Sequence, residues 1–281
     1  MGSVTPFRTI DHTEARRLLE ADAVTILDVR TPGEYAQLGH IPNAWLIPVD
    51  LAASAPAVLP GDGKPVLVYC EHGVRSVAAS QLLVAAGIPE VLNLAGGLAG
   101  WSGPREFGAG PLHGPAVWLI ENADLLPRGG KVLDVACGRG RHALLMASAG
   151  FNVRAIDRNP DAIAFLSQTA ARLNLQVDAA VVDLETDPPP NLPSSTYDAI
   201  LVFNYLHRPL MRALRDAIKP GGRIFYETFT TRQAERGHPK NPDFLLRDGE
   251  LNELMAPFSI QRSREGEFDG RFSASVVAER N

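Results

Sequence analysis

The stretch from Lys131 to Asp157, KVLDVACGRGRHALLMASAGFNVRAID, constrains the fold more than any other part of the sequence. Its first residues, Lys131–Cys137, form an apolar, β-branched run that is typical of a buried parallel strand. Gly138 and Gly140 then allow positive φ angles and a close approach of a ligand to the backbone. A helical stretch follows, and a second strand, Asn152–Asp157, completes a strand–helix–strand unit. This order predicts an α/β fold with a parallel sheet.

Two acids flank the glycine turn. Asp134 lies inside the first strand, and Asp157 ends the second, about 20 residues after the glycines, where nucleotide-type folds place an acid on the ribose hydroxyls. A dinucleotide fingerprint requires a third glycine, but position 143 is Ala. The string D-x-A-C-G-x-G resembles motif I of the class I S-adenosylmethionine-dependent methyltransferases, whose loop accommodates an amino-acid tail. The alternative, an ordinary glycine turn, does not explain the spacing of both acids.

The alternation of helices and strands continues to the end of the chain. We expect a helix from Asn159 to Leu173 and strands at Gln176–Val182, Tyr197–Phe203, Arg223–Thr228, Ile260–Arg264 and Phe272–Glu279, the last of them antiparallel. In the methyltransferase class this pattern forms a doubly wound, seven-stranded, Rossmann-like sheet. The strings DVACGRGRHALLMA and YETFTTR look most like the tellurite-resistance and thiol-type enzymes of the class, which have small substrates.

This resemblance implies S-adenosyl-L-methionine as the cofactor. The residues that it implies for cofactor binding are Asp134, Ala136, Gly138, Gly140, Asp157, Arg158, Asp183, Leu184 and Asn204. Within that set, Asp183 would bind the adenine amine and Leu184 would pack on the ring. The candidate bases in a possible acceptor site are Tyr205, His207 and His142, although each of these residue types is more often structural than catalytic.

The first third of the chain carries three further strings, DVRTPGEYAQLGHIPNA, YCEHGVRS and LAGGLAGW. Together they resemble the rhodanese domain, and the resemblance covers Phe7 to Trp101. It implies a small α/β fold and a cysteine that carries sulfane sulfur as a persulfide. The fold class that we predict for the whole chain is therefore α/β, with a rhodanese-like domain before the methyltransferase domain.

Cys70 is the candidate nucleophile of the first domain, at the end of the strand Lys64–Cys70 and before a helix expected at Val77–Ala86. Backbone N–H groups of the active-site loop, which comprises Glu71, His72, Gly73, Val74 and Ser76, can form an anion-binding nest that favours the reactive thiolate. Arg75 adds a fixed positive charge. The C-x4-R spacing is one residue shorter than the C-x5-R of the related phosphatases, so it fits a sulfur atom better than a phosphate.

The loop also contains an acid. Glu71 is expected to raise the pKa of Cys70 slightly and to disfavour anionic donors such as thiosulfate, and a protonated His72 would offset this effect. The remaining alternative for Cys70 is a buried, inert cysteine, the commoner fate of free cysteines.

A Gly- and Pro-rich segment separates the two predicted domains. We expect a sulfurtransferase domain at residues 1–103, a linker at 104–115 and the methyltransferase domain at 116–281. The amphipathic stretch Ala116–Leu126 opens the latter as a helix, and the resemblance implies that it covers the cofactor, with Trp118 packed inward.

Composition excludes several classes of function. The net charge of −5 lacks the excess of positive charge that is typical of nucleic-acid-binding proteins. No apolar run reaches the ~18 residues that a membrane span requires. The first residues lack the apolar segment of a signal peptide, and Pro6 occupies the Ser/Thr position of a myristoylation signal. Two distant cysteines predict no disulfide framework. We expect a cytoplasmic protein without a metal site, a nucleic-acid partner or a membrane.

The leading hypothesis is a bifunctional enzyme. It transfers sulfane sulfur through a persulfide on Cys70 and methylates a small acceptor, such as a thiol, sulfide or other chalcogen species, so its partners are a small-molecule sulfur donor and a methyl acceptor. The alternative is a methyltransferase regulated by a rhodanese-like sulfur- or redox-sensing module. A third hypothesis, a sulfurtransferase with a degenerate cofactor fold, conflicts with the intact acids and glycines. The sequence leaves the donor, the acceptor, the base, any coupling of the sites and the oligomeric state open.

Overall fold

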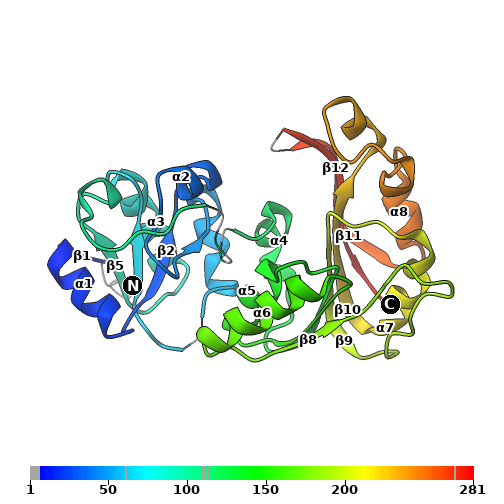
Figure 1. The fold of residues 1–281 in the computed structure, drawn as a ribbon, viewed down its shortest axis with the longest axis horizontal. Coiled ribbons are helices and arrows are strands. Elements are labelled where there is room, and N and C mark those ends of the chain that lie inside the picture. Colours follow the sequence, from blue (N-terminus) through cyan, green and yellow to red (C-terminus); the bar gives the residue numbers. More distant parts are fainter. Residues whose placement is uncertain (1–6, 61, 109, 111, 113, 269) are drawn as a thin grey trace. The chain divides into compact units, whose positions relative to one another are not determined.

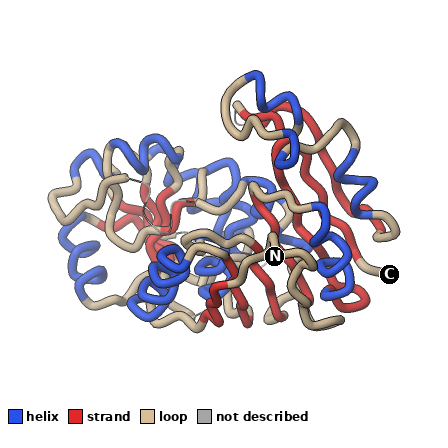
Figure 2. The backbone as a smooth tube through the Cα atoms, turned by 45° about the vertical axis from the view of Figure 1, so that its right-hand side comes forward, coloured by secondary structure: helices blue, strands red, loops and turns tan. Residues whose placement is uncertain are grey.

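The computed structural model describes residues 7–60, 62–108, 110, 112, 114–268 and 270–281. The chain divides into two compact units, residues 1–124 and 125–281. Each unit has its own β-sheet, and Figure 2 shows the strands as two separate groups. Pro6 and the start of the predicted first domain lie outside the described residues. In the described part of the chain, no helix is long and apolar enough to cross a membrane.

Unit 1 is built on five parallel strands in the order β1-β5-β4-β2-β3 (Figure 1). These strands are β1 (Arg8–Ile10), β2 (Thr25–Asp28), β3 (Trp45–Leu46), β4 (Val66–Tyr69) and β5 (Val91–Leu94). The helices are α1 (His12–Glu20), α2 (Pro32–Gln37), η1 (Val49–Ala57), α3 (Val74–Ala85), η2 (Leu98–Gly100) and α4 (Val117–Glu121). Every residue of β2, β4 and β5 is buried, which is why these strands are almost continuously apolar.

Helix α2, which the sequence analysis did not assign, begins with a capping box. Thr31 Oγ1 accepts from the backbone N–H of Glu34 at 3.3 Å, and the Glu34 carboxylate accepts from the backbone N–H of Thr31 at 3.0 Å. Reciprocal caps of this kind satisfy N–H groups that a helix cannot pair internally. The cap fixes Glu34 in the first turn of α2, where it contributes to the candidate site described below.

The helix after Cys70 begins three residues earlier than the sequence predicts. We expected it from Val77, but α3 begins at Val74 because Gly73 adopts a left-handed conformation with φ +86° and turns the chain directly into the helix. Arg75 and Ser76 therefore lie in the first helical turn, and α3 points its N-terminus toward the cysteine.

The segment after Trp101 hydrogen-bonds with unit 1. Glu106 and His40 exchange two backbone hydrogen bonds of 2.8 and 2.9 Å, and Gly108 N–H donates to the Ala36 carbonyl at 2.8 Å. Helix α4 packs against η1, and the division between the units falls after Asp124. The domain limits at residues 103 and 116 stay predictions, and residues 109, 111 and 113 of the linker lie outside the described ones.

Unit 2 contains a seven-stranded sheet in the order β11-β12-β10-β9-β6-β7-β8, so the predicted seven-stranded, doubly wound architecture is confirmed. Only β12 runs antiparallel to its neighbours. The strands are β6 (Lys131–Val135), β7 (Asn152–Asp157), β8 (Val177–Val181), β9 (Tyr197–Phe203), β10 (Ile218–Phe229), β11 (Ser259–Phe268) and β12 (Arg271–Glu279). The chain reverses its direction of winding between β6 and β9, and in open α/β sheets ligands bind at such switch points.

The helices of unit 2 are α5 (Arg141–Ser148), α6 (Pro160–Arg172), α7 (Met211–Ala217) and α8 (Glu250–Met255), with short 3-10 turns η4 (Arg208–Leu210), η5 (Thr231–Glu235) and η6 (Pro242–Phe244), while η3 (Ala123–Leu125) spans the division between the units. Figure 1 shows α5 and α6 side by side. Alternate residues of β6, β9, β10 and β12 share one hydrophobic cluster with α7 and α8. This packing fixes the carboxyl ends of the central strands, where the predicted cofactor residues lie.

Candidate active sites

Cys70 follows β4 directly and is buried, with 1% of its surface exposed. The backbone N–H of Gly73 donates to its Sγ at 3.1 Å. Sγ also lies 3.5 Å from Ser76 Oγ, and that hydroxyl lies 3.2 Å from the Gly73 carbonyl. The Ser76 hydroxyl can thus donate to the carbonyl while Cys70 is a thiol and to Sγ once it is a thiolate.

These contacts stabilise the thiolate. Burial raises the pKa of Cys70, but the Ser76 hydroxyl and the backbone N–H groups of Ser76, His72 and Gly73 lower it, and the net shift is downward. Hydrogen-bond donors that converge on one atom at a helix N-terminus favour an anion there. The donors of the loop therefore converge on Cys70, and its role as the nucleophile stays a prediction.

A glycine turn holds this loop in place. The N–H groups of Leu98 and Ala99 donate to the carbonyls of Cys70 and Glu71 at 2.8 and 2.9 Å. Gly97 precedes them with φ +67°, and a Cβ there would lie only 2.4 Å from the Cys70 carbonyl oxygen. The LAGGLAGW string thus carries a glycine because the backbones approach too closely for a side chain.

Replacing Gly97 with Ala is expected to lower the free energy of unfolding of unit 1 by about 2–3 kcal/mol, since strain and a backbone clash add. All three tryptophans of the sequence precede residue 125, so intrinsic fluorescence during thermal unfolding follows unit 1. Gly96→Ala is the matched control, because Gly96 has a similar φ of +68° but open space around its Cβ position. Equal losses in the two variants would contradict the role of close approach.

Two ion-pair clusters that the sequence analysis did not assign surround the loop. Arg30 is fully buried and donates to both Asp28 oxygens, to the Gly39 carbonyl and, at 2.7 Å, to Glu71 Oε2. Arg75 donates to both Glu34 oxygens, at 2.8 and 2.5 Å. Asp28, Arg30 and Glu34 all belong to the DVRTPGEY string, so the sequence already pointed to these residues. Only the fold brings them to the Cys70 loop.

The ion pairs change the expected effect of Glu71. Its carboxylate is bound by Arg30, and the contacts around Cys70 shift the thiol pKa downward. His72 and Val74, the other loop residues, expose their side chains to solvent. The loop thus presents exposed side chains outward while its backbone N–H groups face the sulfur.

In unit 2 the glycine turn and the two acids come together as the spacing predicts. Asp157 Oδ2 accepts from the Gly138 N–H at 2.8 Å, and its Oδ1 accepts from the Asn159 N–H at the same distance. Gly138 has φ +55° with open space at its Cβ position, and Ala136 also adopts a positive φ, of 52°. The turn is therefore held against the end of β7 and leaves free volume beside the backbone.

Asp134 is completely buried below this turn and accepts from the Ala143 N–H at 3.0 Å. Burial raises the pKa of Asp134 to about 7, although the Ala143 N–H and the charge of Arg141 act in the opposite direction. A carboxyl group that titrates near neutral pH next to a glycine turn is a candidate functional group.

The other predicted cofactor residues follow neighbouring strands at the same carboxyl edge. Arg158 follows β7 and pairs with Glu185 at 2.8 Å, and Asp183, after β8, is exposed. Leu184 is buried in the unit 2 core. Asn204 follows β9, is exposed and has φ +56°.

The three candidate acceptor-site residues differ in their surroundings. Burial raises the pKa of Tyr205, and the charges of Glu185, Asp183 and Asp157 add to the effect, so this phenol lies near the acids of the carboxyl edge. Within the described residues, the buried Oη of Tyr205 and Nε2 of His207 have no hydrogen-bond partner. His142 instead packs against the Phe203 ring, with centroids 4.4 Å apart.

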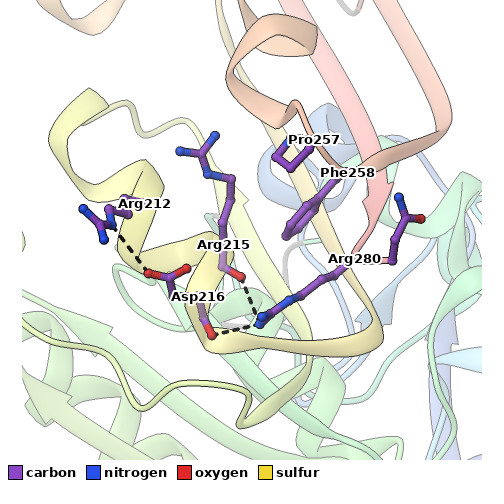
Figure 3. Close-up of a pocket in the computed structure, with 7 residues that line it drawn as sticks. Arg212, Arg215, Asp216, Pro257, Phe258 and Arg280 are labelled. Carbon is purple, nitrogen blue, oxygen red and sulfur yellow. Dashed lines mark hydrogen bonds and ion pairs between the residues drawn. The ribbon is translucent and has the colours of Figure 1, made fainter.

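A separate pocket of about 550 Å³ lies at the opposite, amino edge of the unit 2 sheet (Figure 3). It is lined by Arg212, Arg215, Asp216, Pro257, Phe258, Arg280 and Asn281. Arg280 donates to the carbonyls of Asp216 and Ile218 at the end of α7, and Arg215 donates to those of Leu254 and Ala256. Positive groups at a helix C-terminus stabilise the helix, which explains why Arg280 lies there. None of the predicted site residues lines the pocket.

Comparisons with known proteins match the two parts of the chain separately. The family model for the rhodanese-like domain matches residues 11–104, and the model for the tellurite resistance protein TehB matches residues 113–234. A sulfurtransferase of Allochromatium vinosum is 39% identical over 31% of this chain and 80% of its own length. The thiosulfate sulfurtransferase GlpE of Coxiella burnetii is 38% identical over 34% of this chain and 87% of its length.

The second unit is similar to a probable S-adenosyl-L-methionine-dependent methyltransferase, TehB of Haemophilus influenzae. The identity is 37% over 28% of this chain, and the match spans only 27% of that protein. The crystal structure of TehB aligns with 58% of this chain and 61% of the TehB chain at 22% identity and a TM-score of 0.49. The chain belongs to the rhodanese-like sulfurtransferase family through its first domain, and a TehB-type, S-adenosylmethionine-dependent methyltransferase domain follows it.

Proposed function

We propose that the chain is a bifunctional enzyme that transfers sulfane sulfur through a persulfide on Cys70 and methylates a small acceptor, a thiol, sulfide or other chalcogen species. The observation that supports it most is the Cys70 loop, in which N–H groups and the Ser76 hydroxyl lower the pKa of a buried thiol. A thiolate is the form that attacks sulfane sulfur. Two of the related proteins are named as sulfurtransferases, one of them for thiosulfate.

The free volume at Gly138 and the carboxyl-edge acids fit S-adenosyl-L-methionine. We assign the amino-acid end to the glycine turn with Asp134, the ribose to Asp157 and the adenine to Asp183 and Leu184, with Ala136, Gly140, Arg158 and Asn204 around them. When bound, the cofactor supplies an electrophilic methyl group on a sulfonium sulfur. We assign the orientation of the acceptor to Tyr205 and His207, and this is supported by their buried polar atoms, which have no hydrogen-bond partner among the described residues. A thiolate or hydrosulfide acceptor needs little help from a general base.

Isothermal titration with S-adenosylmethionine, before and after loading Cys70 with a sulfane donor, tests the proposal. We expect a mass increase of one sulfur atom on Cys70, measurable binding in both states and methylation of a small thiol or sulfide. If Cys70 takes up no sulfur while its oxidation alters methylation, the alternative of a sensing module replaces the bifunctional enzyme. Absence of cofactor binding would refute the methyl-transfer half.

The pKa of Asp134 predicts how cofactor affinity depends on pH. The pKa of Asp134 in the folded chain, about 7, exceeds the ordinary value of 3.8, so without the cofactor this carboxyl stays protonated between these two pH values. The contribution of Asp134 to the free energy of unfolding therefore falls as the pH rises from 3.8 to about 7. Only the carboxylate attracts the cofactor's ammonium group. Affinity should therefore rise about eightfold from pH 6 to pH 7.5, with proton release measurable by titration in buffers of different ionisation enthalpy. In Asp134→Asn, which keeps an acceptor for Ala143, this pH dependence should disappear.

A further inference from the structure

Charged side chains pair with one another around Cys70, and sulfur transfer by itself does not require their net charge. Two guanidinium groups, Arg30 and Arg75, meet three carboxylates, Asp28, Glu34 and Glu71, in direct ion pairs. One net negative charge remains in this set. Arg30 is completely buried and shared by two carboxylates, so it offers no charge to a donor.

Arg75, the second guanidinium of the set, is partly exposed. The hydrogen bonds that Arg75 donates to Glu34 chiefly raise the pKa of Arg75, and the Cys70 thiolate adds a smaller effect, so the guanidinium lies within electrostatic range of the sulfur. Both of its Nη atoms are nevertheless occupied by Glu34. In this bidentate geometry one carboxylate accepts from two N–H groups of the arginine at once. An incoming anion must therefore compete with Glu34 for Arg75.

Neutral dipoles, in contrast, stabilise the single negative charge of the sulfur itself. The Gly73 N–H donates to Sγ, and the Ser76 hydroxyl lies 3.5 Å from Sγ, where it can donate to the thiolate. The loop therefore supports one anionic sulfur without offering a free cation for a second charge on the donor. A dianion such as thiosulfate brings that second charge.

Resting on the proposed function, we infer that the Cys70 loop selects sulfane donors that carry at most one negative charge, thiosulfonates or hydropersulfides, over the dianion thiosulfate. In the reaction the Cys70 thiolate attacks the sulfane sulfur and forms the Sγ–S bond. The bond from the sulfane sulfur to the rest of the donor breaks, and its electron pair leaves with sulfite, a sulfinate or a thiolate. The charge of the attacking thiolate is thereby passed to the leaving group, while the outer sulfur of the new persulfide keeps the charge or the proton that it had in the donor, and no external oxidant or reductant is required.

The test compares thiosulfate with methanethiosulfonate, in which a methyl group replaces one anionic oxygen. Both donors transfer sulfur from a sulfonyl sulfur, and their charges are −2 and −1. Each kcat/KM is divided by the rate constant of the uncatalysed transfer to a small thiolate. We expect the normalised value for methanethiosulfonate to exceed that for thiosulfate about threefold to tenfold at low salt, and the gap to narrow at high ionic strength.

Glu34→Gln and Glu71→Gln each remove one charge while keeping an oxygen that can accept from Thr31 or Arg30. Each change should raise kcat/KM for thiosulfate about tenfold and for methanethiosulfonate about threefold. The Coulomb repulsion between the removed carboxylate and the donor is twice as large for the dianion as for the monoanion. Glu20→Gln is the matched control, an exposed carboxylate on α1 that faces Arg16.

A normalised preference for thiosulfate in the unaltered chain, or donor ratios unchanged in both glutamine variants, would overturn the inference and leave sulfur transfer itself intact. If neither donor adds a sulfur atom to Cys70, the proposed sulfur transfer fails together with the donor preference. The two failures are therefore distinguishable in one set of measurements.

Discussion

Cys70→Ser is expected to lower sulfur transfer by about 10⁴-fold or more, because a serine hydroxyl in this loop stays protonated and forms no persulfide. The hydrogen bonds that stabilise a thiolate at Cys70, from the Gly73 N–H and the Ser76 hydroxyl, do not lower the pKa of an alcohol enough to replace it. The rate of sulfur transfer from a sulfane donor to cyanide or a small thiol measures the loss.

Cys137→Ser is the matched control for this prediction. Cys137 is the other cysteine of the sequence, and burial raises its pKa, in contrast to Cys70. Its replacement should leave sulfur transfer unchanged. S-adenosylmethionine binding by the Cys70→Ser variant should also be unchanged, because the residues assigned to the cofactor all lie in unit 2. Undiminished sulfur transfer in Cys70→Ser would refute the assignment of the nucleophile.

The second large effect is expected for Asp157→Ala, which should weaken S-adenosylmethionine binding by about 100-fold or more. The carboxylate accepts from the N–H groups of Gly138 and Asn159, so its removal releases the glycine turn as well as the proposed ribose contact. Two lost charge-assisted hydrogen bonds and one ligand contact correspond to about 3 kcal/mol or more. Titration calorimetry measures the affinity.

A structural role and a ligand role of Asp157 can be separated. Asp161→Ala removes an exposed acid from the first turn of α6, where the helix dipole alone is affected, and should change cofactor affinity less than threefold. Hydrogen exchange of unit 2 without cofactor then reports how far Asp157→Ala loosens the turn. Wild-type affinity in Asp157→Ala would exclude the residue from the site, whatever its effect on the turn.

The sequence predicted the fold of both units because their strands are strongly patterned. The runs around Leu67, Leu133 and Ile200 are mostly apolar and buried, and the glycine-containing turns that follow the first two mark where those strands end. The same local signals located Cys70, Gly138 and Asp157 at carboxyl ends of strands. Several elements without such patterns were not predicted, among them the capped helix α2, the two-residue strand β3 and helix α8.

What the sequence by itself determined is therefore the chemistry of each site: a cysteine in a C-x4-R loop, and a glycine turn between two acids. Only the tertiary structure decided the charge state around them. Arg30 and Glu71 are 41 residues apart, as are Glu34 and Arg75, and their pairing depends on how β2, α2 and the Cys70 loop pack. The pKa shifts of Cys70 and Asp134 likewise result from burial and from donors that converge in space. Such distances cannot be read from a linear pattern, because the Coulomb and desolvation energies depend on the final positions of atoms.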